Sequence, residues 1–438
     1  MQAQAKTKFK KTPIGEIPED WEVVRLKDVL LILRNGLTAR QNKEGVGYPI
    51  TRIETIAMER IDPSKVGFVE NVSPKDLEKY RLYPGDILFS HINSLTHIGK
   101  TAIYEGKPNP LLHGMNLLLL RPDSKKIKPW YLLWLLKLYR ERGIFKNIAK
   151  KAVNQASINQ TELGKLKIPL PPLPEQKKIT EILRTVDEAI EKTDGAIERT
   201  ERLKKGLMQR LLTRGIKHER FKKTDLGEIP EEWRVVRLGE IAQKIKTGPF
   251  GSQLRKSELT DRGIKVYTQD NVLRRDFSLG NIYISPEKFK QLKSMEVKPG
   301  DILLTIRGTV GKAIVVPEGV EKGIIHTNLA IIRVNPEILW PEYLERIIND
   351  SKIIPWQINA ARSSTTLPAL YAGTIKRLKL PLPPLSEQKQ IAEILSTVDR
   401  KLELLRQRRE KLERVKRGLM KDLLTGRKRV LVTTEKHK

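Results

Sequence analysis

The sequence predicts an α+β fold in which two mixed domains of short strands and helices each lead into a long amphipathic helix. Two observations predict it. The segment Pro-Leu-Pro-Pro-Leu-x-Glu-Gln occurs at residues 169–176 and again at 381–388, 212 positions later. Each copy is followed by about forty residues in which apolar side chains recur at helical spacing. The chain is therefore a tandem duplication, and a helix closes each half.

The repeat also predicts the domain boundaries. A chain of 438 residues is long enough for two or three domains with cores of their own, and the duplication favours two. The expected parts are a first domain with an N-terminal arm (1–172), a first long helix (173–214), a second domain (215–384), a second long helix (385–426) and a basic tail that frays (427–438).

Composition indicates an anionic partner. Lys and Arg number 83 against 52 Asp and Glu, a formal net charge of +31, and such an excess is typical of chains that bind polyanions. Nucleic acid is the first candidate and an anionic membrane surface the second. No apolar run reaches the roughly 18 residues of a spanning helix, and no signal peptide is visible. The absence of Cys excludes disulfides and agrees with a cytoplasmic protein.

Each half opens with the same motif, Ile-Pro-Glu-x-Trp, at residues 17–21 and 229–233. The two tryptophans, Trp21 and Trp233, again lie 212 positions apart. A Trp after a turn more often packs than binds a ligand, so we expect both to be core anchors.

The halves share a second motif, Pro-Gly-Asp, at residues 84–86 and 299–301. It predicts a tight turn that leads into an apolar strand, with Asp86 and Asp301 capping the turn. Further strands are predicted at 116–121 and 328–333, and helices beginning at Pro129 and Pro341.

Between these motifs the halves diverge. Residues 33–47 in the first half and 247–255 in the second are polar loops that contain Gly, so they belong at the surface. A strand-like run follows each loop, at 48–54 and 264–271. Similar scaffolds therefore present different side chains.

The long helices each carry one apolar stripe on a surface otherwise rich in Lys, Arg and Glu. A helix of forty residues is about 60 Å long, more than one small domain can cover. Each helix needs a partner, and we predict that the two pair antiparallel as a coiled coil. The alternative is a basic amphipathic helix on lipid, which the acids spread along both helices disfavour.

Catalytic motifs are not found. Gly-Lys-Thr at 99–101 lacks the earlier Gly of a phosphate-binding loop, and its twin has Ala313 in place of Thr. The six His show no metal-ligand spacing, and without Cys a structural zinc site is disfavoured. Both Pro-Pro pairs are followed by Leu, where amino-methyltransferases have an aromatic residue. This pattern predicts a chain that is not an enzyme.

A basic, duplicated chain with divergent loops fits a reader of DNA sequence, which needs side chains able to bond base edges. Residue type and loop position select the candidates Arg34, Asn35, Arg40, Gln41, Arg52 and Gln155 in the first half, and Gln253, Arg255, Gln269, Asn271, Arg307 and Arg362 in the second.

Taken together, these motifs resemble the DNA-specificity subunits of type I restriction-modification systems. The match rests on Ile-Pro-Glu-x-Trp, Pro-Gly-Asp-Ile-Leu, Gly-Pro-Phe-Gly-Ser at 248–252 and Leu-Pro-Pro-Leu-x-Glu-Gln, and it spans nearly the whole chain. The resemblance implies two target-recognition domains, each reading one part of a split asymmetric site on double-stranded DNA. Because the scaffold repeats, a pseudo-dyad along the coiled coil would relate them.

The resemblance also implies partners. Modification (methyltransferase) subunits that bind S-adenosylmethionine and restriction subunits that use ATP and Mg²⁺ would carry the chemistry in a prokaryotic cytoplasm, while this chain binds no cofactor. The helices would act as a spacer and docking surface, with candidates Glu175, Gln176, Ile179, Leu183, Val186, Ile190, Glu387, Gln388, Ile391, Leu395, Val398 and Leu402.

Two other interpretations remain open on the sequence. A structural coiled-coil protein could bind nucleic acid without sequence preference, and uniform affinity for random duplexes would favour it. A self-sufficient methyltransferase would transfer methyl groups from S-adenosylmethionine with no other subunit.

Overall fold

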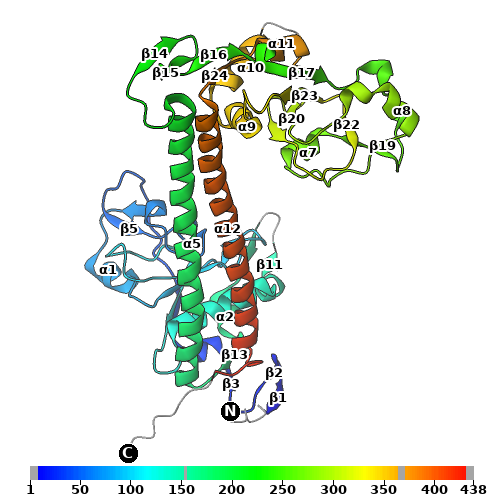
Figure 1. The fold of residues 1–438 in the computed structure, drawn as a ribbon. Coiled ribbons are helices and arrows are strands. Elements are labelled where there is room, and N and C mark those ends of the chain that lie inside the picture. The colour runs from blue at the N-terminus through cyan, green and yellow to red at the C-terminus, as the bar shows by residue number, and fades with distance from the viewer. Residues whose placement is uncertain (1–7, 152–154, 364–369, 431–438) are drawn as a thin grey trace, which may run out of the picture. The chain divides into compact units, whose positions relative to one another are not determined.

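The computed structural model describes residues 8–151, 155–363 and 370–430. The chain forms two compact units, residues 1–194 with 407–438, and residues 195–406. The division falls inside both long helices, so each unit contains one mixed domain and half of each helix (Figure 1).

The domain of the first unit is built on a four-stranded antiparallel sheet in the order β4-β10-β7-β9. Side chains from the sheet and helix α2, including Phe89, Leu118 and Trp134, form its core. The elements are β1 (Phe9–Thr12), β2 (Gly15–Pro18), β3 (Glu22–Arg25), β4 (Leu30–Asn35), β5 (Tyr48–Ile50), β6 (Gly67–Val69), α1 (Pro74–Tyr80), β7 (Ile87–Phe89), β8 (Ile92–Asn93), β9 (Thr101–Ile103), β10 (Leu118–Pro122), α2 (Pro129–Glu141), α3 (Ile144–Ile148), β11 (Lys150–Lys151), β12 (Ala156–Ser157), α4 (Gln160–Gly164), β13 (Lys167–Leu170) and α5 (Leu173–Arg214).

The second unit repeats this plan with the sheet β17-β23-β20-β21. A three-stranded sheet, β19-β18-β22, adds a second core beside it. The elements are β14 (Phe221–Thr224), β15 (Gly227–Pro230), β16 (Arg234–Arg237), α6 (Leu238–Ile241), β17 (Ala242–Thr247), β18 (Ile264–Tyr267), α7 (Gln269–Leu273), β19 (Tyr283–Ile284), α8 (Pro286–Gln291), β20 (Ile302–Thr305), β21 (Ala313–Val315), β22 (Gly323–Ile325), β23 (Leu329–Val334), α9 (Pro341–Asp350), α10 (Ile353–Ser363), α11 (Ala372–Arg377), β24 (Lys379–Leu382) and α12 (Leu385–Leu423).

Within each unit the halves of α5 and α12 lie side by side and antiparallel, as predicted (Figure 1). In the first unit Asp187 pairs with Lys416 at 2.7 Å and Asp194 with Arg409 at 2.6 Å, so rising numbers on α5 meet falling numbers on α12. The second unit has an equivalent pair, between Lys204 of α5 and Asp399 of α12, at 2.6 Å. Asp399 lies 212 positions after Asp187, and Lys204 lies 212 positions before Lys416.

A buried glutamine at the start of each long helix joins that helix to its domain. The side-chain Oε1 of Gln388 accepts from the backbone N of Trp340 at 2.8 Å, and Nε2 donates to the carbonyls of Ile338 and Pro383 at 3.0 and 2.9 Å. Gln176 makes the same three bonds in the first unit, to the backbone of Lys128, Lys126 and Pro171. Since Lys128 and Trp340 are the N-caps of α2 and α9, each glutamine ties two helix starts together.

A buried glutamate beside each glutamine accepts from the opening tryptophan. Glu175 lies 3.0 Å from Trp21 Nε1, and Glu387 lies 2.9 Å from Trp233 Nε1. Both tryptophans are fully buried, which confirms their prediction as core anchors.

A basic side chain then completes each glutamate site. His218 Nε2 lies 2.9 Å from Glu387 Oε1, while Arg429 donates to both oxygens of Glu175 at 2.7 and 2.9 Å and also pairs with Asp20. The prediction that the tail from residue 427 frays was therefore wrong for Arg429, because a buried carboxylate holds it. Residues 431–438 lie outside the described part of the chain.

The two Asp of the Pro-Gly-Asp motif cap their turns, as predicted. Asp86 accepts from the backbone N of Tyr83 at 2.8 Å, and Arg121 donates to both of its carboxylate oxygens at 2.7 and 2.8 Å. Asp301 makes the same contacts with the backbone of residue 298 and the guanidinium of Arg333.

The strand-like runs at 48–54 and 264–271 are only half strand. β5 and β18 end at Ile50 and Tyr267, and helical turns follow. The cause is local capping: the backbone N of Thr268 donates to Asn271 Oδ1 at 2.8 Å, which turns the chain into α7.

Replacing Gln388 by Ala should lower the free energy of unfolding by about 2–4 kcal/mol, because it leaves several buried backbone groups unpaired. Gln390, exposed on the same helix, is the matched control, and Gln390→Ala should change stability by less than about 0.5 kcal/mol. Denaturant unfolding followed by circular dichroism measures both. Equal effects of the two substitutions would contradict the role given to Gln388.

Candidate nucleic-acid interface

The divergent loops begin at equivalent points on the two scaffolds. A Cβ at Gly36 would lie 2.3 Å from the carbonyl oxygen of Gly114, and one at Gly248 would lie 2.1 Å from that of His326. Only glycine fits such a close backbone approach. The start of each loop is therefore held against the sheet, although the residues that follow differ.

In the first unit the structure brings two of the candidates together. Gln41 and Arg52 both lie against Gly67 and line one cavity of about 440 Å³, together with Met115. Arg52 is partly neutralised, since its Nε lies 3.4 Å from Glu54 Oε2. These side chains form a mixed polar and apolar hollow that could accept a base edge.

The remaining candidates of the first unit are spread over its surface. Arg34 is half-buried, and its guanidinium carbon lies 5.5 Å from the centre of the Tyr80 ring; burial is the main cause that lowers its pKa. Asn35, Arg40 and Gln155 are exposed.

In the second unit Arg307 is stacked on Phe250, with its guanidinium carbon 4.8 Å from the ring centre. Phe250 lies in the loop after β17, and its backbone N donates to Gln253 Oε1 at 2.9 Å. Gln253 and Arg255 are exposed. Phe250 was not among the predicted site residues, although an aromatic residue in the surface loop Gly248-Pro249-Phe250-Gly251 is a signal for a contact role.

Two candidates of the second unit are less accessible than a base contact requires. Asn271 is buried, and its amide is used inside the chain, accepting from Thr268 and donating to the carbonyls of Asp276 and Leu279. Its predicted contact with a base is therefore corrected to a structural role. Gln269 is half-buried and packs behind residue 308, with its Oε1 covered. Arg362 lies in α10, and its side chain is outside the described part.

The helix candidates for docking are mostly turned inward. Glu175, Gln176, Glu387 and Gln388 are buried at the joints described above, so partner subunits cannot reach them. The apolar candidates Ile179, Leu183, Ile190, Ile391, Leu395 and Leu402 are buried as well, and Val186 and Val398 are half-buried. The chain packs these residues against its own helices and domains, as the predicted helix pairing requires, so for the buried residues the expected contact with partner subunits is corrected to packing within the chain.

A cleft of about 1040 Å³ lies inside the second unit, between its halves of α5 and α12 and the edge formed by α7, β21 and α9. Leu404, two-thirds exposed, lines it beside basic residues. In the first unit the corresponding cavity, lined by Trp130 and Trp134, is about 490 Å³.

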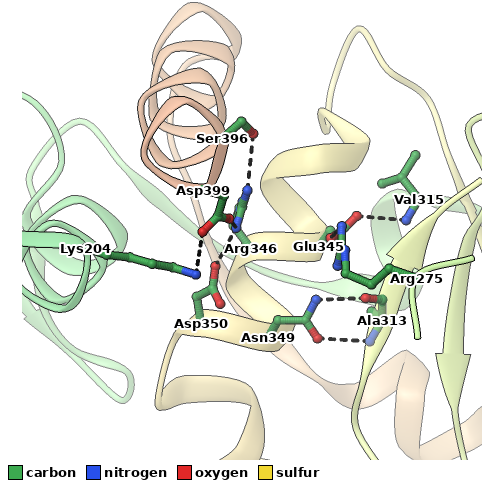
Figure 2. A network of polar contacts seen from close by, with 10 residues as sticks. All are labelled: Lys204, Arg275, Ala313, Val315, Glu345, Arg346, Asn349, Asp350, Ser396 and Asp399. Atoms are coloured by element: carbon green, nitrogen blue, oxygen red, sulfur yellow. Dashed lines mark hydrogen bonds and ion pairs between the residues drawn. The ribbon is translucent and has the colours of Figure 1, made fainter. Parts of the chain in front are cut away.

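Figure 2 shows the polar network along the larger cleft. Arg346 of α9 donates to Asp399 at 2.5 Å, to Asp350 at 3.1 Å and to Ser396 at 3.2 Å, and Lys204 reaches the same Asp399. Burial would raise the pKa of the Asp399 carboxyl, but hydrogen bonds from Lys204 and Arg346 outweigh it and lower that pKa.

Groups of metal ligands and long apolar helices are both missing from residues 8–151, 155–363 and 370–430. No group of three or more His, Asp or Glu there is placed to hold a metal ion. Burial lowers the pKa of both His91 and His113 to about 4, so these rings are neutral at pH 7. No described helix is both long and apolar enough to cross a bilayer.

Replacing Arg346 by Ala should lower the free energy of unfolding at pH 7 by about 1–3 kcal/mol. The reason is that Asp350 and Asp399 lose a shared partner in a partly buried site. Arg400, next in sequence to Asp399, pairs with Glu393 on the surface, and Arg400→Ala should cost less than about 0.5 kcal/mol.

The cost of Arg346→Ala should depend on pH. The lowered pKa of Asp399 means that its stabilisation is present above the ordinary value of 3.8 and is lost as the pH falls through the folded value. Denaturant unfolding of wild type and Arg346→Ala at pH 7 and at pH 3 measures this dependence. If the difference between their free energies of unfolding were as large at pH 3 as at pH 7, the ion pair of Arg346 with Asp399 would not be its cause.

Comparison with known proteins places this architecture. A model of the family described as "Type I restriction modification DNA specificity domain" matches the chain twice, at residues 18–200 and 230–414. A candidate specificity subunit of the type I restriction enzyme MjaX from Methanocaldococcus jannaschii is 47% identical over 423 residues, 96% of this chain and 97% of that protein. The specificity subunit of the type I restriction enzyme MjaVIII from the same organism is 30% identical over 440 residues, 98% of each.

A solved structure shares the fold. The S subunit of the type I restriction-modification system from M. genitalium gives a TM-score of 0.56 at 17% identity, over 92% of this chain and 96% of that chain. The chain therefore belongs to the type I restriction-modification DNA specificity family, as a DNA-recognition subunit and not an enzyme.

Proposed function

We propose that each unit of this chain reads one half of a split, asymmetric site on double-stranded DNA, and that the paired helices set the gap between the halves. The observation that carries the proposal is one scaffold bearing two different loop sets. Gly36 and Gly248 start the loops at equivalent points. In the first unit the loop residue Gln41 then lines a cavity with Arg52, whereas in the second unit the loop residue Phe250 stacks on Arg307.

Charge supports binding to a duplex. The net charge of +31 would release counterions from the phosphates, a term that is independent of sequence. Sequence preference needs the loop side chains in addition, because phosphate contacts position a protein without reading bases.

Partner subunits would carry the chemistry. We propose that modification subunits bind S-adenosylmethionine and that restriction subunits use ATP and Mg²⁺, in the cytoplasm of a prokaryotic cell. Exposed apolar side chains on the long helices, rather than the buried ones predicted earlier, are the better docking surface. They are Leu203 at 53% exposure, Leu404 at 66% and Val415 at 44%.

Selection from a random duplex library tests the proposal directly. The full-length chain should enrich a motif with two separated halves of different sequence, and its affinity for that motif should exceed its affinity for random duplexes by about 10³-fold or more. Uniform affinity across sequences, falling steeply with salt, would instead identify a structural protein that binds nucleic acid without preference.

Lengthening both helices should change the gap alone. Asp194 and Arg409 face each other at 2.6 Å, so four residues inserted after Asp194 and before Arg409 extend both helices at matching positions. The added length is about 6 Å, roughly two base pairs of duplex. Selection with this variant should return the same half-sites with a longer gap.

Insertion into α5 alone is the control, since it breaks the facing register and should abolish the selection of a defined gap. Half-sites of changed sequence in the doubly extended variant would contradict the helices' role as a spacer.

A further inference from the structure

The loop after β17 presents an aromatic ring from a fixed turn. Gly248 is held against His326, and its N–H donates to the carbonyl of Leu329 at 2.8 Å. Two residues on, the backbone N of Phe250 donates to Gln253 Oε1 at 2.9 Å and closes the turn. Phe250 is nevertheless 37% exposed, so packing in a core is not the reason for its fixed position.

Arg307 comes to this ring from a second fixed segment. It follows Ile306, which is fully buried and hydrogen-bonded on both sides, to the carbonyl of Asn328 and from the N–H of Leu370, each at 2.9 Å. The guanidinium lies 4.8 Å from the ring centre, within the range of a cation–π contact. Both partners of the stack therefore have little backbone freedom.

The charge of Arg307 is not neutralised by an acid in the described part of the chain. Other arginines of the second unit differ: Arg333 pairs with Asp301 at 2.6 Å and Arg346 with Asp399 at 2.5 Å. Arg214, which also stacks on a ring in this unit, lies 3.6 Å from Glu228. An arginine that is oriented but unpaired is suited to an external acceptor.

We propose that Arg307, held flat on Phe250, reads one guanine in the half-site bound by the second unit. A stacked guanidinium uses its face and keeps its edge N–H groups, whose fork matches O6 and N7 of guanine in the major groove. Stacking limits the rotamers that must be ordered on binding, which favours discrimination. This inference rests on the proposed reading of DNA by the loops.

A backbone phosphate offers a similar pair of acceptors, so the test must separate the two. Duplexes are first selected from a random library by the full-length wild-type chain, and the selection is repeated with Arg307→Lys, Arg307→Ala and Phe250→Ala. Arg307→Lys keeps the charge and loses the fork. At one guanine, Arg307→Lys and Arg307→Ala should lower the preference over adenine by about 10- to 100-fold.

The ring should matter at the same base. Phe250→Ala should weaken the preference there by a smaller factor, about three- to tenfold, and Phe250→Tyr should restore it. Arg262, exposed in the same unit, is the charge-matched control, and Arg262→Ala should leave every base preference unchanged.

A base analogue keeps the test valid even if a variant fails to fold. Placing 7-deazaguanine at that position removes N7 and should weaken binding by the wild-type chain. The affinity of Arg307→Ala should be the same for the 7-deazaguanine duplex and the guanine duplex. A uniform loss of affinity with a salt slope smaller by about one would identify a phosphate contact and overturn the inference. An unchanged motif in the Arg307 variants would also overturn the inference. A wild-type chain that enriches no motif would instead contradict the proposed function itself.

Discussion

The hydrogen bond between a buried glutamate and a buried tryptophan at the start of each long helix is the contact on which both units depend. A carboxylate in that position requires a positive or donor partner, because an unpaired buried charge is costly. Glu387 obtains one from the segment after α5, through His218, and Glu175 obtains one from the segment after α12, through Arg429. In each unit the contact thus joins three parts of the chain that are distant in sequence. The segment after α12 supplies the basic side chain in the first unit, and the segment after α5 supplies it in the second.

This arrangement separates scaffold from recognition. The glutamate, the adjoining glutamine and the capped Pro-Gly-Asp turn recur with nearly the same distances in both units, while the loop residues that follow Gly36 and Gly248 make different contacts. Because the joints do not involve the loops, loop residues can change without weakening them. A subunit built in this way can alter what it reads while keeping its attachment to the helices.

Features that repeat were predictable from sequence, since two copies with one register expose what the scaffold requires. The duplication, the buried Trp21 and Trp233 and the two long helices belong to this class. Features set by a single contact were not. The capping by Asn271 that ends a strand depends on one side-chain bond, and the hold of Glu175 on Arg429 depends on a residue far along the chain. Phe250 was not among the predicted residues because polar side chains are favoured for reading bases, whereas the Phe250 ring lies under the guanidinium of Arg307.

One repeated scaffold should therefore carry two different readers of DNA at a distance set by its helices. The decisive measurement is a map of the methylated bases in the DNA of a cell that carries this chain together with the proposed modification subunits. The expected result is a motif of two unlike halves separated by a fixed number of unspecified base pairs. A single uninterrupted motif, or two identical halves, would contradict it.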